Sequence, residues 1–429
     1  MKYLPATNFV ILHLTGKKDN KFRLQHNKSP NWWEKDSFFT YPYFLISAFY
    51  GLPFPNFRED FNIPTKNFEL MGDSGGFSYY KKNINLDPMR VLEWHENNCD
   101  IGFSLDYPLV KTDNATDVKI KNKHSIKNIL DVLPKRKNDK MEFYPCIHGW
   151  NEKQVIDYHK QIPDDQVQGY GIGECSATDD RPEGIISRIL LEVSLNENKK
   201  RLHILGCCSP LMIGFLNLVE QKEGIELSYD STAFSNGAMY RWYHLDGFKK
   251  DKHRITGKKK KYQGIWGEHE EPITTVTKLS CKCPVCSVVP VEEMKTADSE
   301  GCGYVCLHNL YHEIELDKQI TKLSKEPNKL LKFLNNCYND RNQYNKIIRL
   351  IKEYINMDTE KFIKRHPYNN KFNAFRNVQL ETWLGDNRTE LRMAEERLQK
   401  TSKKKKATKK AEIVKEEPKY QLKDEDWDI

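Results

Sequence analysis

Short apolar segments recur along the first 230 residues of the chain, and each runs into a polar residue or a glycine. They cover residues 68–73, 100–106, 143–148, 168–173, 201–206 and 225–230. Amphipathic stretches lie between them, at 87–98, 125–133, 151–162, 184–195 and 210–221, and several begin with residues that favour a helix start. Strands alternating with helices of this length predict βα units and a parallel sheet. With residues 8–14 as the first strand, we expect a (β/α)8 TIM barrel.

The polar ends of these segments define a candidate site. They are Asp73, Asp106, His148, Gly173, Gly206 and Asp230. In a (β/α)8 barrel, the active site is built from residues at the C-terminal ends of strands that are far apart in sequence. Three aspartates and a histidine at such positions therefore predict one constellation. Taken singly, each aspartate is equally well explained as a turn residue or a helix N-cap, and the histidine as a core residue.

The first of these aspartates opens a glycine-rich turn, Asp73-Ser74-Gly75-Gly76-Phe77. Two glycines after a strand let the backbone approach a ligand closely, and the Phe77 ring can stack on a planar base. A tight βα turn without a ligand explains the same residues.

The other two aspartates suit complementary roles. Asp106 can accept two hydrogen bonds from the edge of a flat heterocycle, and His148 can contribute to the same pocket. Asp230 follows a clear strand, where a carboxylate can act as a nucleophile that forms a covalent glycosyl intermediate. Two carboxylates in one pocket can divide the work, one as nucleophile and one as acid/base.

Composition bounds the architecture. The chain has 429 residues, of which 38% are hydrophobic, and a net charge of +8. We expect a TIM-barrel catalytic domain at 1–275, a zinc-binding subdomain at 276–325, a helical region at 326–396 and a charged, disordered tail at 397–429. No apolar run approaches the ~20 residues that span a bilayer, and we find no export signal. A cytoplasmic protein with reduced cysteines is therefore expected.

The cysteine-rich segment predicts a metal site. Cys281, Cys283 and Cys286 fall within six residues, and the helical pattern that follows carries His308. Three thiolates and one imidazole suit a closed, structural, tetrahedral Zn²⁺ site. Rival ligands are His312, Cys302 and Cys306. The alternative is a group of thiols without metal.

Together, these motifs resemble the tRNA-guanine transglycosylase superfamily, and its archaeosine-type branch more than its bacterial queuine branch. The stretches are GDSGGF (72–77), CDIGFSLDYP (99–108), YPCIHG (144–149), GYGIGE (169–174), HILGCCSP (203–210), YDSTAF (229–234), CKCPVC (281–286) and LHNLY (307–311). They occur in the family's order over roughly residues 8–320. Each is short, but jointly they are specific.

The resemblance implies a role for each matching residue. Asp230 corresponds to the nucleophile that attacks C1′ and releases guanine, and Asp73 to the acid/base. Phe77 stacks on the base, Asp106 reads its edge, and Gly173 lines the pocket. The remaining substrate-binding positions are Ser74, Gly75, Gly76 and His148. The zinc ligands are Cys281, Cys283, Cys286 and His308, and the LHN context favours His308 over His312.

Departures from the family pattern bear on the substrate. The family commonly has glutamine where this chain has His148, and the arginine-bearing anticodon loop of queuine-type enzymes is replaced by STAFSNGAMYR after Asp230. Archaeosine-type enzymes carry C-terminal RNA-binding domains, whereas in this sequence we expect a short helical region and a lysine-rich tail at that place. This pattern is similar to the DpdA-type enzymes of bacteria and phages, which insert 7-deazaguanines such as preQ0 into DNA.

The expected activity is therefore exchange of guanine in DNA for a free 7-deazaguanine, without a nucleotide cofactor. The target base must be flipped out or lie in a single strand. Lysines 258–261 and the tail lysines 403–406, 409 and 410 are candidate phosphate contacts or solvated charges. A homodimer is compatible with this reading. Alternatives are the same chemistry on tRNA, an inactive nucleic-acid-binding paralogue, and a glycoside hydrolase.

Overall fold

The computed structural model describes residues 1–6, 14, 21–81, 85–110, 113–173, 175, 182–239, 242–244, 252–254, 263–264, 267–268, 281–296, 299–337 and 342–368. The chain forms two compact units, Met1–Asn369 and Asn370–Ile429, and every described residue lies in the first. The lysines of 258–261 and those of the tail lie outside the described residues, as does the segment 397–429.

Two parallel sheets form the centre of the first unit. In spatial order, the first contains β1 (Lys2–Pro5), β9 (Leu227–Ser231), β8 (Arg201–Ile204), β7 (Gly169–Ile172) and β6 (Cys146–Ile147). The second contains β2 (Tyr43–Ser47), β3 (Glu69–Asp73), β4 (Ile101–Phe103) and β5 (Glu142–Tyr144). Two short antiparallel pairs lie apart from them: β10 (Trp242–His244) with β11 (Lys252–Arg254), and β12 (Gln263–Gly264) with β13 (Gly267–Glu268). The α/β class with parallel sheets is confirmed.

The two sheets approach each other at both ends. Ala6, just after β1, forms a parallel bridge with Leu45 of β2. At the other end, Pro145 separates β5 from β6, and its carbonyl accepts a hydrogen bond of 2.8 Å from Gly171 of β7. Proline has no backbone N–H, so the strand predicted at 143–148 is interrupted here and continues beyond the interruption.

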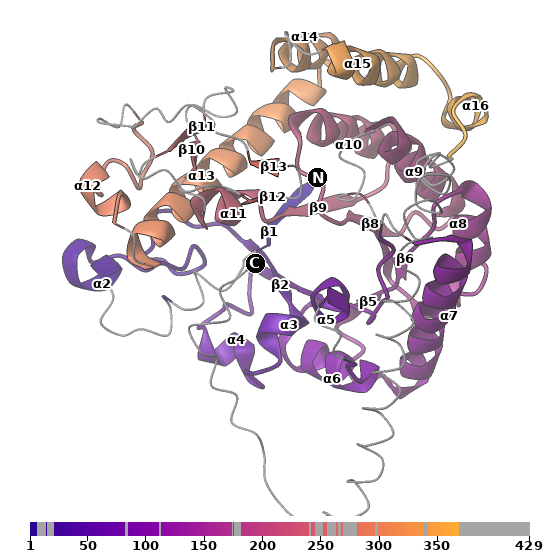
Figure 1. Ribbon diagram of the computed structural model, residues 1–429, viewed down its shortest axis with the longest axis horizontal. Coiled ribbons are helices and arrows are strands. Elements are labelled where there is room, and N and C mark those ends of the chain that lie inside the picture. Colours follow the sequence, from indigo (N-terminus) through magenta and orange to yellow (C-terminus); the bar gives the residue numbers. More distant parts are fainter. Residues whose placement is uncertain are drawn as a thin grey trace, which may run out of the picture. The chain divides into compact units, whose positions relative to one another are not determined.

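Helices follow most strands. They are α2 (Lys21–His26), α3 (Ala48–Gly51), α4 (Phe57–Asp60), α5 (Gly76–Lys81), α6 (Pro88–Asn98), α7 (Ala115–Val132), α8 (Glu152–His159), α9 (Pro182–Leu195), α10 (Pro210–Glu223), α11 (Ala233–Met239) and α12 (Val291–Met294), followed by α13 (Ser299–Ser324), α14 (Pro327–Cys337), α15 (Asn342–Ile355) and α16 (Thr359–Arg365). Figure 1 shows α6 to α10 in chain order on the outer side of the strands. Of the helices in the described part of the chain, none combines the length and apolarity needed to span a bilayer.

The predicted helix starts are built as the sequence indicates. Asp87 caps α6 by accepting a hydrogen bond from the Met89 N–H, and Ser209 caps α10 in the same way through Met212. Each cap is followed by a proline, whose missing N–H is not needed in the first turn. Helix α10 ends at Gly224, which adopts φ +63°.

Both faces of the strands are buried, and adjacent residues contribute to different clusters. Leu4, Leu45 and Met71 belong to a small cluster with Phe103 and Tyr144. Their neighbours along the strands pack instead into the large core that includes the helices. This alternation follows from the two-residue period of a strand, and it leaves the parallel strands shielded from water on both sides.

The structure corrects the prediction at the start of the chain. The first strand in the described part of the chain is Lys2–Pro5, which was not predicted. Of the stretch 8–14, predicted as the first strand, residues 8–13 lie outside the described residues, and Leu14 is helical and buried. Strand Tyr43–Ser47 was not predicted. The helix predicted at 125–133 begins ten residues earlier, at Ala115, where Asn114 and Asp117 form a capping box. Within the helical region predicted at 326–396, the described residues form α14, α15 and α16, and residues 369–396 lie outside the described part of the chain.

Candidate functional site

The predicted site residues lie at one edge of the parallel strands. Asp73 ends β3, Asp106 lies three residues beyond β4, and His148 directly follows β6. Gly173 directly follows β7, and Asp230 lies within β9. Since these strands are parallel, all five positions come to their C-terminal ends.

Asp106 is held by two neighbours. Ser74 Oγ donates to Asp106 Oδ1 at 2.5 Å, and His148 Nε2 lies 2.8 Å from Oδ2. Burial alone would raise the pKa of Asp106, but the hydrogen bond and charge of His148, together with Ser74, lower it below its usual value. Asp106 is therefore ionised, and His148 donates through Nε2. A Cβ at Gly173 would lie 2.6 Å from His148 Nδ1, so only glycine leaves room for this imidazole.

Asp73 is in the opposite electrostatic state. Burial, followed by the negative charges of Asp106 and Asp230, raises its pKa from 3.8 to about 7, against hydrogen bonds from Gly75 and Ser47. The Gly75 N–H donates to Asp73 Oδ2 at 3.1 Å. A carboxyl group that titrates near neutrality can give and take a proton at working pH. Asp73 and Asp106 therefore differ in charge, because the pKa of Asp73 is raised and that of Asp106 is lowered.

The glycine turn after Asp73 is required by its surroundings. Gly75 adopts φ +76°, a conformation that other residues rarely take. A Cβ at Gly76 would lie 2.5 Å from both the carbonyl oxygen and Oδ1 of Asp106, which is closer than real contacts allow. Phe77 opens the following helix with 59% of its surface exposed, so its ring is available to a ligand.

Asp230 is buried, with 8% of its surface exposed, and is anchored through one carboxylate oxygen. The Gly206 N–H donates to Asp230 Oδ1 at 2.7 Å, and His203 Nε2 lies 3.3 Å from the same oxygen. Burial lowers the pKa of His203, against the influence of Asp230, so the imidazole is neutral.

Three residues at this site were missed by sequence reasoning. Ser47 pairs in register with Asp73 at the end of the unpredicted strand β2. His203 lies inside a segment whose end, Gly206, had been noted but given no role. Cys146 offers a sulfur within 4.8 Å of ligand atoms of Asp106 and His148, so these three residues could hold a metal ion. The hydrogen bond between Asp106 and His148 already satisfies these two groups without one.

A second cluster lies in the cysteine-rich segment. Cys281, Cys283, His308 and His312 offer ligand atoms within 4.8 Å of one another and could hold a metal ion. Cys283 Sγ lies 3.3 Å from His308 Nδ1, and Cys281 Sγ lies 3.1 Å from His312 Nε2. In tetrahedral Zn²⁺ coordination, a sulfur and a nitrogen ligand are roughly 3.5 Å apart, so the donor set and spacing fit zinc.

Cys286 competes with His312 for the fourth ligand position. Its sulfur lies 3.2 Å from His308 Nδ1 and 3.0 Å from the Tyr243 hydroxyl. His308 Nε2 lies 2.6 Å from the His244 carbonyl, so this nitrogen carries the proton and Nδ1 faces the sulfurs. Such an outer hydrogen bond is typical of metal-bound histidine.

Helix α13, which carries His308 and His312, is hydrogen-bonded to two strands through side chains. The Tyr3 hydroxyl of β1 donates to Glu313 Oε2 at 2.6 Å, and the Tyr229 hydroxyl of β9 donates to Asp317 Oδ1 at 2.8 Å. Both carboxylates are buried. Tyr229 directly precedes Asp230 in the sequence. The Cys/His cluster and Asp230 are therefore connected through a single helix and one strand.

A scan against protein-family models finds no match to this chain, and a search of curated proteins finds none either.

Proposed function

We propose that this protein is a transglycosylase that exchanges guanine in DNA for a 7-deazaguanine base such as preQ0. We further propose that its eight parallel strands, with β5 and β6 counted as one, close into a (β/α)8 barrel. The bridge from Ala6 to Leu45 and the hydrogen bond from Gly171 to Pro145 support closure, because they join the two sheets at both ends. The family resemblance of the motifs supports the activity.

One observation carries the proposal: Asp73, Asp106 and Asp230 lie at the C-terminal ends of three strands, and burial together with the charges of Asp106 and Asp230 raises the pKa of Asp73 to about 7. Base exchange by double displacement needs a carboxylate nucleophile and a separate group that can donate and then accept a proton. The pocket supplies both.

The proposed reaction has two steps, and each step forms one bond to C1′ and breaks another. Asp230 attacks C1′ of the target deoxyguanosine, the C1′–N9 bond breaks, and protonated Asp73 gives its proton to the departing guanine. The entering base then loses its N9 proton to Asp73, and N9 attacks C1′ to release Asp230. The covalent Asp230–deoxyribosyl intermediate keeps the DNA strand intact throughout.

The other pocket residues would bind the base. Ionised Asp106 can accept hydrogen bonds from the N–H groups on the guanine edge, with His148 holding the carboxylate in place. Exposed Phe77 is available to stack on the ring. A 7-deazaguanine keeps the same donor edge, so one pocket can take the leaving and the entering base.

We assign the cysteine cluster as a structural Zn²⁺ site. When bound, zinc would stabilise the fold by joining the 281–286 segment to α13, since a site with four protein ligands leaves no position for substrate. The reaction itself is left to the carboxylates.

The second candidate is the same exchange on tRNA, which the archaeosine-type resemblance favours. The two are separated by incubating purified protein with isotope-labelled preQ0 and duplex DNA, single-stranded DNA or bulk tRNA. Each polymer is then digested to nucleosides and analysed by mass spectrometry. We expect label in deoxynucleosides, and more with single-stranded than with duplex DNA if base flipping limits the rate.

Variants at Asp230 provide the control. Asp230→Ala should abolish exchange and Asp230→Asn should nearly do so, because no other residue of the site, among those that the structure describes, is placed to be the nucleophile. Label only in ribonucleosides would make this a tRNA enzyme. Full turnover by both variants would remove Asp230 from its role, and no label in any polymer with the unmodified protein would contradict the proposed activity.

A further inference from the structure

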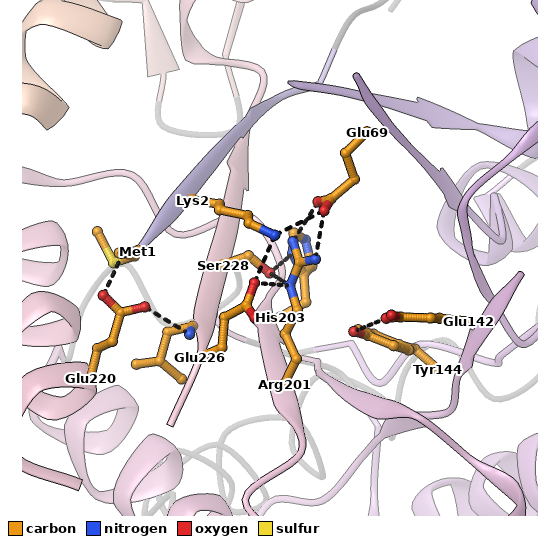
Figure 2. Close-up of polar contacts among 11 residues, drawn as sticks. Met1, Lys2, Glu69, Glu142, Tyr144, Arg201, His203, Glu220, Glu226 and Ser228 are labelled. Atoms are coloured by element: carbon orange, nitrogen blue, oxygen red, sulfur yellow. Dashed lines mark hydrogen bonds and ion pairs between the residues drawn. The ribbon is translucent and has the colours of Figure 1, made fainter. Parts of the chain in front are cut away.

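A line of hydrogen bonds leads through the strands to the candidate nucleophile, and Figure 2 shows most of it. Arg201 binds both oxygens of Glu69, at 2.9 and 2.6 Å, and its Nε donates to Ser228 Oγ at 3.2 Å. Ser228 Oγ lies 2.9 Å from His203 Nδ1. On the other side of the imidazole, His203 Nε2 lies 3.3 Å from Asp230 Oδ1.

The groups at the two ends of this line, Arg201 and Asp230, determine which atoms donate and which accept. Arginine only donates, so Ser228 accepts from Arg201 and keeps its own hydroxyl proton for another partner. Asp230 Oδ1 is a carboxylate oxygen that already accepts from the Gly206 N–H, so His203 Nε2 must carry the proton that points towards it. Since the imidazole is neutral, Nδ1 then has no proton and accepts from Ser228. The Asp230 end therefore requires the Nε2–H tautomer, and the Arg201 end is compatible with it because Ser228 still has a proton to donate.

The ring has little freedom to adopt another arrangement. His203 is fully buried, and its centroid lies 5.4 Å from that of Phe103. Arg201 is fixed in turn, because Lys2 also contacts Glu69, at 3.0 Å. The anchoring groups come from β1, β3, β8 and β9, so the line depends on strands that are far apart in sequence.

The two oxygens of Asp230 are consequently different. Oδ1 accepts from the Gly206 N–H at 2.7 Å and from His203. Among the described residues, no hydrogen bond reaches Oδ2. We propose that His203, held as its Nε2–H tautomer by Ser228 and Arg201, is a positioning residue that fixes Asp230 Oδ1 and leaves Oδ2 to attack C1′. The attacking role rests on the proposed function, whereas the tautomer does not.

The experiment combines spectroscopy with kinetics. ¹⁵N resonances of labelled histidine, assigned by loss of one signal in His203→Gln, report the tautomer directly. We expect a neutral Nε2–H imidazole that is perturbed in Ser228→Ala, which removes the donor to Nδ1. A charged ring, or an Nδ1–H tautomer in the unmodified protein, would overturn the proposal.

The kinetic arm compares single-turnover exchange and KM for the entering base. His203→Leu should lower the rate about 10²-fold, as expected for a displaced reacting group, with KM unchanged. His203→Gln retains an N–H donor and should recover at least part of the loss. His124→Leu, at an exposed histidine outside the site, should match the unmodified protein.

The outcomes separate the two proposals. An unmodified protein without exchange activity contradicts the proposed function, while the ¹⁵N spectrum still decides the tautomer. An active protein in which His203→Leu keeps the full rate refutes the positioning role alone. If His203→Leu fails to fold, His203→Gln is compared with the unmodified protein instead. A lower single-turnover rate with unchanged KM supports the positioning role, and a change in KM alone opposes it.

Discussion

Replacing Asp73 by asparagine should stabilise the protein at neutral pH while abolishing base exchange. Asparagine keeps an oxygen that can accept from the Gly75 N–H but carries no charge. The pKa of Asp73 is raised from 3.8 to about 7 by burial and by the charges of Asp106 and Asp230. At 1.36 kcal/mol per pKa unit, that change corresponds to at most about 4 kcal/mol of folding free energy.

The sign follows from proton linkage. Between about pH 4 and pH 7, the folded protein keeps the Asp73 proton and the unfolded chain loses it. Stability contributed by this group is therefore fully present below pH 4 and is lost as the pH rises to about 7. Asp73→Asn has no carboxyl group at this position and does not lose stability in this way. The difference in free energy of unfolding between Asp73→Asn and the unmodified protein should therefore be absent near pH 4 and reach a plateau above pH 7.

The assay is urea unfolding of both proteins at a series of pH values, comparing the free energy of unfolding at each. Taking the difference cancels titrations that the two share. In an Asp106→Asn background, the gain from Asp73→Asn should shrink, because one repelling charge is gone. A difference that stays flat between pH 4 and pH 8, or that grows towards acid, would refute the reasoning.

Three further predictions concern the turn, the base and the metal. Gly76→Ala should abolish exchange because its Cβ would overlap Asp106, whereas Gly184→Ala, whose Cβ meets nothing within 4 Å, should leave exchange intact; both are read from labelled-base incorporation. Phe77→Ala should raise KM for the entering base about tenfold, as expected for the loss of one stacking contact worth roughly 1–3 kcal/mol, and an unchanged KM would argue against stacking. Cys286→Ala should lower the bound zinc per chain and His312→Ala should not, as measured by metal analysis after dialysis; the reverse result would make His312 the fourth ligand.

Much of the fold could be predicted because its signals are local. Apolar runs ending in turn residues located β3 and β7, and capping residues such as Asp87 and Ser209 marked helix starts. Strand β1 was missed because its four residues, Lys2–Pro5, have no alternating pattern of their own. It is recognisable as a strand only from its parallel pairing with β9, more than 200 residues away.

The residues of the candidate site could also be predicted from local signals. Residues at strand ends can be found one strand at a time, and family motifs linked Asp73, Asp106 and Asp230. Residues that act through another residue leave no such signal. In the sequence, His203 is an ordinary position within an apolar strand. Ser228 is a small residue two positions before Asp230. Their relevance follows only from distances across neighbouring strands.

The attachment of α13 also has a practical consequence for anyone who shortens or recombines this chain. A fragment that ends before the cysteine cluster would retain every carboxylate of the pocket. It would nevertheless leave the hydroxyls of Tyr3 and Tyr229 without their buried acceptors, Glu313 and Asp317. Tyr229, the second of these tyrosines, adjoins Asp230, the proposed nucleophile, on the same strand. The smallest fragment that keeps the proposed site intact therefore extends through α13, and its boundary is set by these two hydrogen bonds rather than by the last residue of the proposed site.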